Sequence, residues 1–138
     1  MDIKNKLEWE EKYSVGVKLI NDQHKTMFTT INKLIEMLSS APNKEKIVEI
    51  INSLLEYKKF HFATEEKYFK EFNYQGATEH INAHQEFGKR LSIIQEKNKD
   101  NVLSLSYDLV DFLEDWLIDH LLTEDQKYKE CFISHGLK

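Results

Sequence analysis

The chain has 138 residues, of which 41% are apolar and 31% are charged, and its formal net charge is −5. This length and composition are typical of one globular domain with a sizeable core. The negative charge argues against nucleic-acid binding, and no apolar run approaches the roughly 20 residues that a membrane-spanning helix needs.

We therefore expect neither a nucleic-acid nor a membrane partner. The N-terminus lacks the apolar segment of a secretory signal. Cys131 is the only cysteine, so an intrachain disulfide and a thiolate metal cluster are both excluded. Together these features predict a cytoplasmic protein.

The first 17 residues lack a sustained hydrophobic period. They predict an arm that lies against the body of the protein, with Trp9 as its packing anchor.

Four amphipathic helices are predicted after the arm, because apolar residues recur there at intervals of three and four. Their approximate ranges are 18–39, 44–72, 78–97 and 102–130. Pro42 cannot continue the first helix, and Asn43 and Thr78 are candidate N-caps of the second and third. Short loops and the lack of a strand signal predict an all-α, up-down-up-down antiparallel four-helix bundle, with residues 1–138 forming one domain.

Polar residues interrupt the apolar stripe of every helix. The interrupting residues are His24, His61, Glu65, His80, His84 and His120. Two pairs, His61 with Glu65 and His80 with His84, are spaced i, i+4, which places both members on one helical face. A buried carboxylate is costly unless it is paired or bound to a metal. His135 lies in the tail, where we expect it to be solvated.

Antiparallel packing brings these residues to one end of the bundle, because helix direction and ligand position alternate together. A single His on an apolar stripe is usually a hydrogen-bonded core residue. So many neutral imidazoles in one place would lack partners, and protonated ones would repel each other. A bound metal removes both difficulties, and this donor set suits iron, zinc, copper or manganese.

A further carboxylate is available on the last helix. Glu124 is i+4 from His120 and lies on the same face of a regular helix, whereas Asp125 is i+5 and lies about 140° away. Periodicity alone therefore favours Glu124. Glu66 points away from the stripe of Glu65, which predicts a solvated residue or a partner of a ligand.

With these motifs in place, the chain resembles the hemerythrins, most closely the single-domain bacterial type. The resemblance covers nearly the whole chain. Its motif is Asp22-Gln23-His24, then HxxxE, HxxxH and HxxxxD, which stand here as His61 to Glu65, His80 to His84, and His120 to Asp125. The resemblance assigns the second carboxylate to Asp125, and we follow it against the periodicity.

The resemblance implies a non-haem di-iron centre with an oxo or hydroxo bridge. One iron would take His80, His84 and His120, and the other would take His24 and His61. Glu65 and Asp125 would bridge the two. One position stays open for O2, on the iron held by His24 and His61.

Four apolar residues are expected to wall the O2 pocket. They are Leu117, Met27, Phe62 and Leu121, each adjacent to a ligand or one turn from it. The resemblance also places a Leu at position 117 over the O2. Because Asp125 is i+5 from His120, we expect a π-type turn or a helix end between them.

The function implied is reversible O2 binding, for carriage, storage or delivery to an O2-consuming partner enzyme, rather than catalysis. The excess of His over carboxylate and the absence of a Glu-x-x-His pattern distinguish this set from ferritin-like di-iron enzymes. The alternatives are sensing of O2, redox state or NO, and an enzyme that reduces peroxide or NO. The sequence does not predict an oligomeric state.

Overall fold

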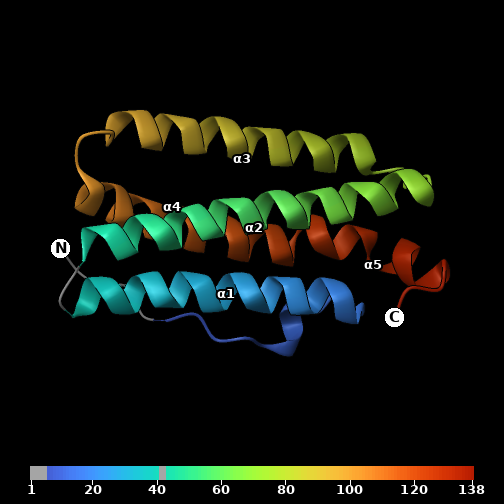
Figure 1. The fold of residues 1–138 in the computed structure, drawn as a ribbon. Helices are drawn as coiled ribbons and strands as arrows, with labels where there is room; N and C mark the ends of the chain where they lie inside the picture. Colours follow the sequence, from blue (N-terminus) through green and yellow to red (C-terminus); the bar gives the residue numbers. More distant parts are fainter. Residues whose placement is uncertain (1–5, 41–42) are drawn as a thin grey trace.

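The computed structural model describes residues 6–40 and 43–138 (Figure 1). Its α-helices are α1 (Lys18–Ser39), α2 (Lys44–Glu71), α3 (Ala77–Lys97), α4 (Val102–Leu122) and α5 (Glu124–Ser134), and a short 3-10 helix, η1 (Glu11–Tyr13), precedes them. No strand occurs among the described residues. Helices α1 to α4 run alternately up and down, with α1 and α3 each packing against α2 and α4. This confirms the predicted antiparallel four-helix bundle.

The helix starts follow local capping chemistry. Asn43 caps α2 as predicted, because its side-chain oxygen accepts from Lys46 N at 3.1 Å. Helix α3 begins one residue earlier than predicted, with Gly76 at the N-cap, so Thr78 lies inside the first turn and does not cap it. Pro42, expected to end the first helix, lies outside the described residues.

The predicted fourth helix is two helices, not one. Thr123 is both the C-cap of α4 and the N-cap of α5. Its backbone angles (φ −116°, ψ −78°) differ from those of a regular α-helix. The chain changes direction there, so α5 folds across the end of the bundle (Figure 1). The expectation of one continuous helix over 102–130 was therefore wrong, whereas the expected irregularity between His120 and Asp125 is confirmed.

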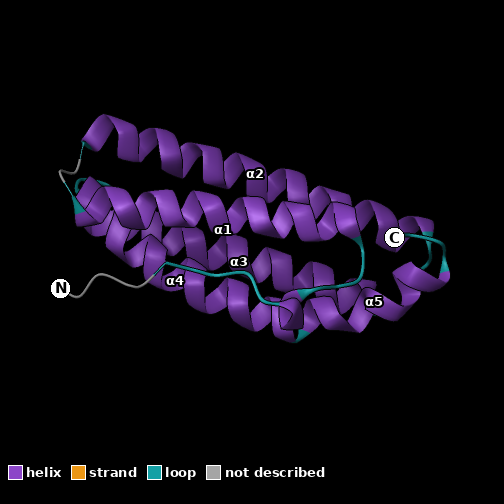
Figure 2. Ribbon diagram, turned by 90° about the horizontal axis from the view of Figure 1, so that it is seen from below, coloured by secondary structure: helices purple, strands orange, loops and turns teal. Residues whose placement is uncertain are grey.

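The N-terminal segment packs along the outside of the bundle, as Figure 2 shows. The backbone of Leu7 exchanges two hydrogen bonds with the Asn32 side chain, at 2.7 and 2.9 Å. Trp9 lies against the rings of Tyr13 and Phe28, with centroids 5.7 Å away in both cases. These contacts attach the segment to α1.

Gly16 is required where this segment turns into α1. Its φ is +74°, and an added Cβ would lie 2.7 Å from the Ile133 side chain of α5. The flanking residues Val15 and Val17 are fully buried. They belong to a second apolar cluster, at the α5 end of the bundle, that also contains Ile20, Phe69, Tyr128 and Phe132. This cluster packs α5 against the end of the bundle.

Among the described residues, no helix has both the length and the apolar composition needed to span a membrane.

Candidate metal centre

A cluster of imidazoles and carboxylates lies inside the bundle, next to the apolar cluster at the α5 end. Its members are His24 from α1, His61 and Glu65 from α2, His80 and His84 from α3, His120 from α4 and Asp125 from α5. None of them is more than 5% exposed. The alternating helix directions bring them together, as the antiparallel arrangement predicts.

The donor atoms form two groups, each with its atoms within 4.8 Å of one another. One group is Glu65, His80, His84 and His120, and the other is His24, His61, Glu65 and Asp125. Glu65 belongs to both groups, so the arrangement is that of two adjacent metal sites rather than one.

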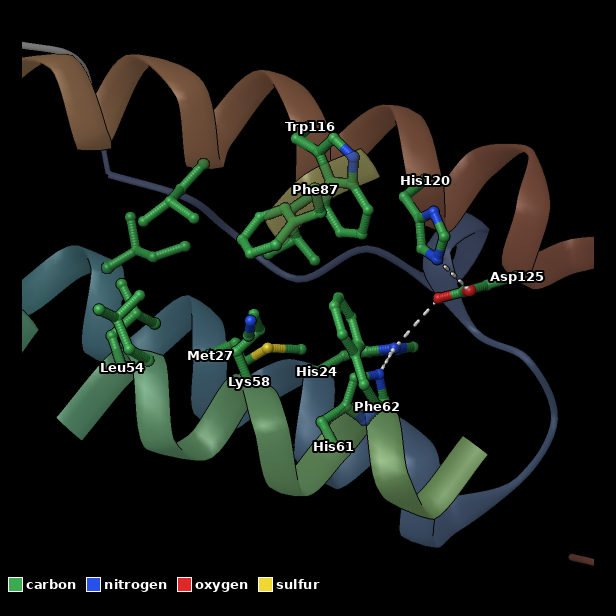
Figure 3. Close-up of a pocket in the computed structure, with 14 residues that line it drawn as sticks. His24, Met27, Leu54, Lys58, His61, Phe62, Phe87, Trp116, His120 and Asp125 are labelled. Atoms are coloured by element: carbon green, nitrogen blue, oxygen red, sulfur yellow. Dashed lines mark hydrogen bonds and ion pairs between the residues drawn. The ribbon is translucent and has the colours of Figure 1, made fainter. Parts of the chain in front are cut away.

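Asp125 also faces both groups of histidines (Figure 3). Its Oδ1 lies 3.0 Å from His120 Nε2 and 3.1 Å from His80 Nε2. Its Oδ2 lies 3.2 Å from His24 Nε2. The two oxygens of this carboxylate are therefore directed toward different sites.

Glu65 is held by a tyrosine. Its Oε1 lies 3.2 Å from His84 Nε2 and 3.5 Å from His61 Nε2. Its Oε2 accepts a hydrogen bond from the Tyr128 hydroxyl at 2.5 Å. Because Tyr128 is fully buried, this bond fixes the orientation of the carboxylate from the α5 side.

Two imidazoles of the cluster have acceptors on the side away from the centre. His61 Nδ1 donates to Gln23 Oε1 at 2.7 Å, and the Gln23 amide donates in turn to Thr64 Oγ1 at 3.3 Å. His84 Nδ1 donates to Glu66 Oε2 at 2.8 Å. Since these Nδ1 atoms carry the proton, the Nε2 atoms of His61 and His84 direct lone pairs into the centre.

The inward-facing atoms contact one another or have no hydrogen-bond partner. His24 Nε2 lies 3.0 Å from His61 Nε2, and His80 Nε2 lies 3.1 Å from His120 Nε2. Several further atoms are buried without a hydrogen bond, namely His84 Nε2, Glu65 Oε1 and both oxygens of Asp125. Without a metal, each facing pair of nitrogens is satisfied only if one member carries the proton, whereas cations between them would be coordinated by the lone pairs of all of these atoms. The donor set, imidazole nitrogen and carboxylate oxygen without thiolate, fits transition-metal ions such as iron.

The electrostatics of the side chains alone keep both carboxylates ionised. Burial would raise the pKa of Asp125, but the charge and proximity of His120 hold it well below its usual range. Burial also acts to raise the pKa of Glu65, yet nearby histidines lower it. Burial lowers the pKa of His61 to about 4. For His80 burial acts in the same direction, but contacts with Asp125 and Glu65 raise its pKa to about 9. The carboxylates are thus available as anionic ligands at neutral pH.

Glu124 does not take part in the cluster. It lies 3.0 Å from Lys127 Nζ, and its side chain is 28% exposed. The prediction from helical periodicity therefore failed, because the break at Thr123 rotates the next turn and directs Asp125 inward. Asp125, which the family resemblance favoured, is the carboxylate that the structure places in the centre.

A small cavity of about 20 Å³ adjoins the centre (Figure 3). Its inner end is formed by His24, His61, His120 and Asp125, and its wall includes Met27, Phe62 and Leu117 of the predicted pocket. Leu121 is fully buried but does not line this cavity. The volume is sufficient for a water-sized or diatomic molecule.

Several supporting residues were not identified as such from the sequence. Tyr128 carries no sequence signal beyond an aromatic residue one turn after Asp125. The Trp116 ring stacks on His120 at 4.2 Å, and Phe62 stacks on His84 at 3.6 Å. These rings fix the orientation of the imidazoles and keep water from them.

Comparison with known proteins agrees with this geometry. Residues 15–132 match the family profile described as the hemerythrin HHE cation binding domain. A bacteriohemerythrin of Clostridium acetobutylicum is 28% identical over 130 residues, covering 87% of this chain and 96% of that protein. A myohemerythrin of Sipunculus nudus is 30% identical over 121 residues, covering 88% of this chain and 89% of that protein.

A solved structure gives the same fold. The crystal structure of a wild-type hemerythrin superposes with a TM-score of 0.81 at 26% identity, covering 91% of this chain and 96% of that one. The family profile covers most of the chain, including every residue of the buried cluster. The chain described here is therefore a member of the hemerythrin family.

Proposed function

We propose that this protein binds O2 reversibly at a non-haem di-iron centre and serves in O2 carriage, storage or delivery. One observation carries the proposal: a buried, histidine-rich pair of donor groups adjoins a small cavity whose other lining residues, except one lysine, are apolar or aromatic. Membership of the hemerythrin family supports it independently.

The ligand assignment is part of the proposal. His80, His84 and His120 would hold one iron, and His24 and His61 would hold the other. Glu65 and Asp125 would bridge them, together with an oxo or hydroxo group. The positions of both carboxylates between the two sets of histidines support the bridging role.

The iron pair, when bound, supplies the reversible electron transfer that O2 binding needs. The protein contributes the surroundings. Gln23 and Glu66 hold the Nδ1 protons of His61 and His84, which keeps their Nε2 atoms free to coordinate. Leu117, Met27 and Phe62 exclude water from the cavity, and exclusion of water and protons opposes loss of reduced oxygen species.

Binding rather than catalysis is favoured by two features of the centre. Imidazoles outnumber carboxylates, and the cavity of about 20 Å³ leaves no room for an organic substrate beside the metal site. Reduction of peroxide or NO, and sensing of O2, redox state or NO, are the alternatives. A cytoplasmic location, a partner enzyme and a single domain over residues 1–138 stay predictions.

The direct test is spectroscopic. The iron-loaded protein is reduced without air, O2 is admitted, and the solution is then purged with an inert gas. An absorption band that appears with O2 and fades on purging supports reversible binding. Irreversible bleaching with release of peroxide, or steady consumption of peroxide or NO, supports the enzyme alternatives.

A further inference from the structure

The wall of the cavity beside the metal centre contains one cationic side chain. Apart from the histidines and Asp125 at its inner end, the lining residues are apolar or aromatic except for Lys58. Lys58 lies on α2, one turn before His61 and Phe62, and its amine points toward the cavity (Figure 3). Its position places a positive charge in the wall of the cavity that adjoins the metal centre.

The Lys58 ammonium is held by aromatic rings rather than by a carboxylate. Its Nζ lies 5.4 Å from the centroid of Phe62 and 4.9 Å from that of Phe87, and both rings line the cavity. Within the described part of the chain, no carboxylate lies within ion-pair distance of it. An ammonium over ring faces keeps its full charge, because the rings attract it without neutralising it.

A lysine whose amine extends into water would not place its ammonium over two aromatic rings. Lysine stems often cover apolar surface while the amine extends into water. Lys58 is instead half-buried, and burial, together with the neighbouring charge of Lys59, lowers its pKa. The amine lies over two rings of the cavity wall although this position costs it hydration.

A local cation matters because the rest of the protein repels anions. The chain has a net charge of −5, and Lys58 is the one cationic side chain other than the histidines in the cavity wall, so its charge acts on a small ion there at close range. O2 carries no net charge, so the electric field of Lys58 does not attract it. The same field attracts a small anion.

We propose that Lys58 forms a subsite for small inorganic monoanions, of the size of azide or nitrite, in the outer part of this cavity. The subsite raises the rate at which such anions reach the metal centre relative to the rate for O2. The delivery of anions to the metal rests on the proposed di-iron function. The attraction of anions to the cavity wall does not depend on that function.

Three variants separate the local charge from its alternatives. Lys58→Met keeps the length of the side chain and removes its charge, and Lys58→Arg keeps the charge. Lys59→Met is the matched control, because Lys59 is exposed, does not line the cavity and gives the same change in net charge. Iron content is measured for each protein, so that only loaded samples are compared.

The first readout is the ratio of two association rates, for azide with the oxidised protein and for O2 with the reduced protein. In Lys58→Met this ratio should fall at least about threefold at low ionic strength, which is less than the roughly tenfold lower end of steering by a whole charged cleft because only one charge is removed. Lys58→Arg and Lys59→Met should stay near the wild-type ratio. The difference should shrink at 0.5 M salt, where the screening length is roughly 4 Å.

The second readout does not depend on iron chemistry. Trp116 lines the cavity, and Trp9→Phe leaves it as the only tryptophan. Quenching of Trp116 fluorescence by iodide, divided by quenching by neutral acrylamide, reports how well anions reach the cavity wall. This quotient should fall in Lys58→Met and not in Lys59→Met.

The inference is overturned if Lys58→Met leaves both the rate ratio and the quenching quotient unchanged, or if Lys59→Met lowers them equally, because net charge then explains the effect. It is also overturned if azide and O2 rates rise together in Lys58→Met, since Lys58 would then only obstruct the cavity. A wild-type protein that holds no iron and shows no azide spectrum contradicts the proposed function, and the quenching quotient still decides the role of Lys58.

Discussion

Asp125 Oδ1 lies 3.0 Å from His120 Nε2, although five positions separate these residues and a regular helix would direct them to different faces. The backbone break at Thr123 makes the contact possible, because α5 restarts there with a new direction. The end of α4 and the start of α5 thus bring two candidate ligands to one centre.

This relationship predicts different outcomes for adjacent substitutions. Asp125→Ala should abolish the di-iron centre, because it removes the carboxylate that faces both sets of histidines. Glu124→Ala should retain the centre, because Glu124 pairs with Lys127 outside the cluster. Iron per chain and the visible spectrum after purification measure both. Loss of the centre in Glu124→Ala with Asp125→Ala intact would show that the ligand assignment is wrong.

Glu66 is predicted to strengthen iron binding through His84. Its carboxylate accepts the Nδ1 proton of His84 at 2.8 Å, and removal of such a partner typically weakens metal affinity by about 10–100-fold. Glu66→Ala should therefore lose iron to a chelator faster, and Glu66→Gln, which keeps an acceptor, should lose it at an intermediate rate. Glu71→Ala, an exposed position on the same helix, is the control. Equal rates for Glu66→Ala and Glu71→Ala would contradict the role.

Tyr128 is predicted to stabilise the fold through Glu65. Tyr128→Phe leaves the buried Oε2 of Glu65 without its donor, which costs about 1–3 kcal/mol in the free energy of unfolding. Guanidinium unfolding of the iron-loaded protein measures the loss. Tyr68→Phe is the comparison, because Tyr68 is partly buried on α2 and makes ring contacts with Phe72 and Phe132. The same unfolding midpoint in both variants would mean that the hydrogen bond contributes nothing.

Leu117 is predicted to protect bound O2 from solvent. Leu117→Ala should cost about 2–5 kcal/mol as a core truncation, and it should also speed autoxidation of the O2 complex, because Leu117 lines the cavity beside His120. Leu34→Ala is a suitable control, since Leu34 is equally apolar, fully buried and absent from the cavity wall. If the two variants autoxidise at one rate, Leu117 has only a packing role.

The sequence was sufficient to predict the bundle and the convergence of its histidines at one end. The regular spacing of apolar residues and the short loops predict antiparallel helices. That topology alone brings together the histidines of different helices, namely His24, His61, His80 and His120. The identity of the second carboxylate required the family resemblance. Periodicity pointed to Glu124, because it assumes a regular helix and carries no information about the break at Thr123.

Other features depend on tertiary packing that local patterns do not encode. Leu121 is adjacent to His120 in sequence but does not line the cavity, whereas Leu54 lines it from another helix. Tyr128 reaches Glu65 only because α5 folds across the end of the bundle. The position of the Lys58 amine over Phe62 and Phe87 likewise follows from the packing of α2 against α3.

The most direct test of the central claim is a paired stoichiometry of iron and of releasable O2 on one sample. Protein reconstituted with ferrous iron without air is analysed for iron, saturated with O2, and then purged while the released O2 is measured. The account predicts two irons per chain and one O2 released for every two irons. A single iron that reconstitution cannot raise, stoichiometric zinc, or O2 that is consumed and not released would contradict it.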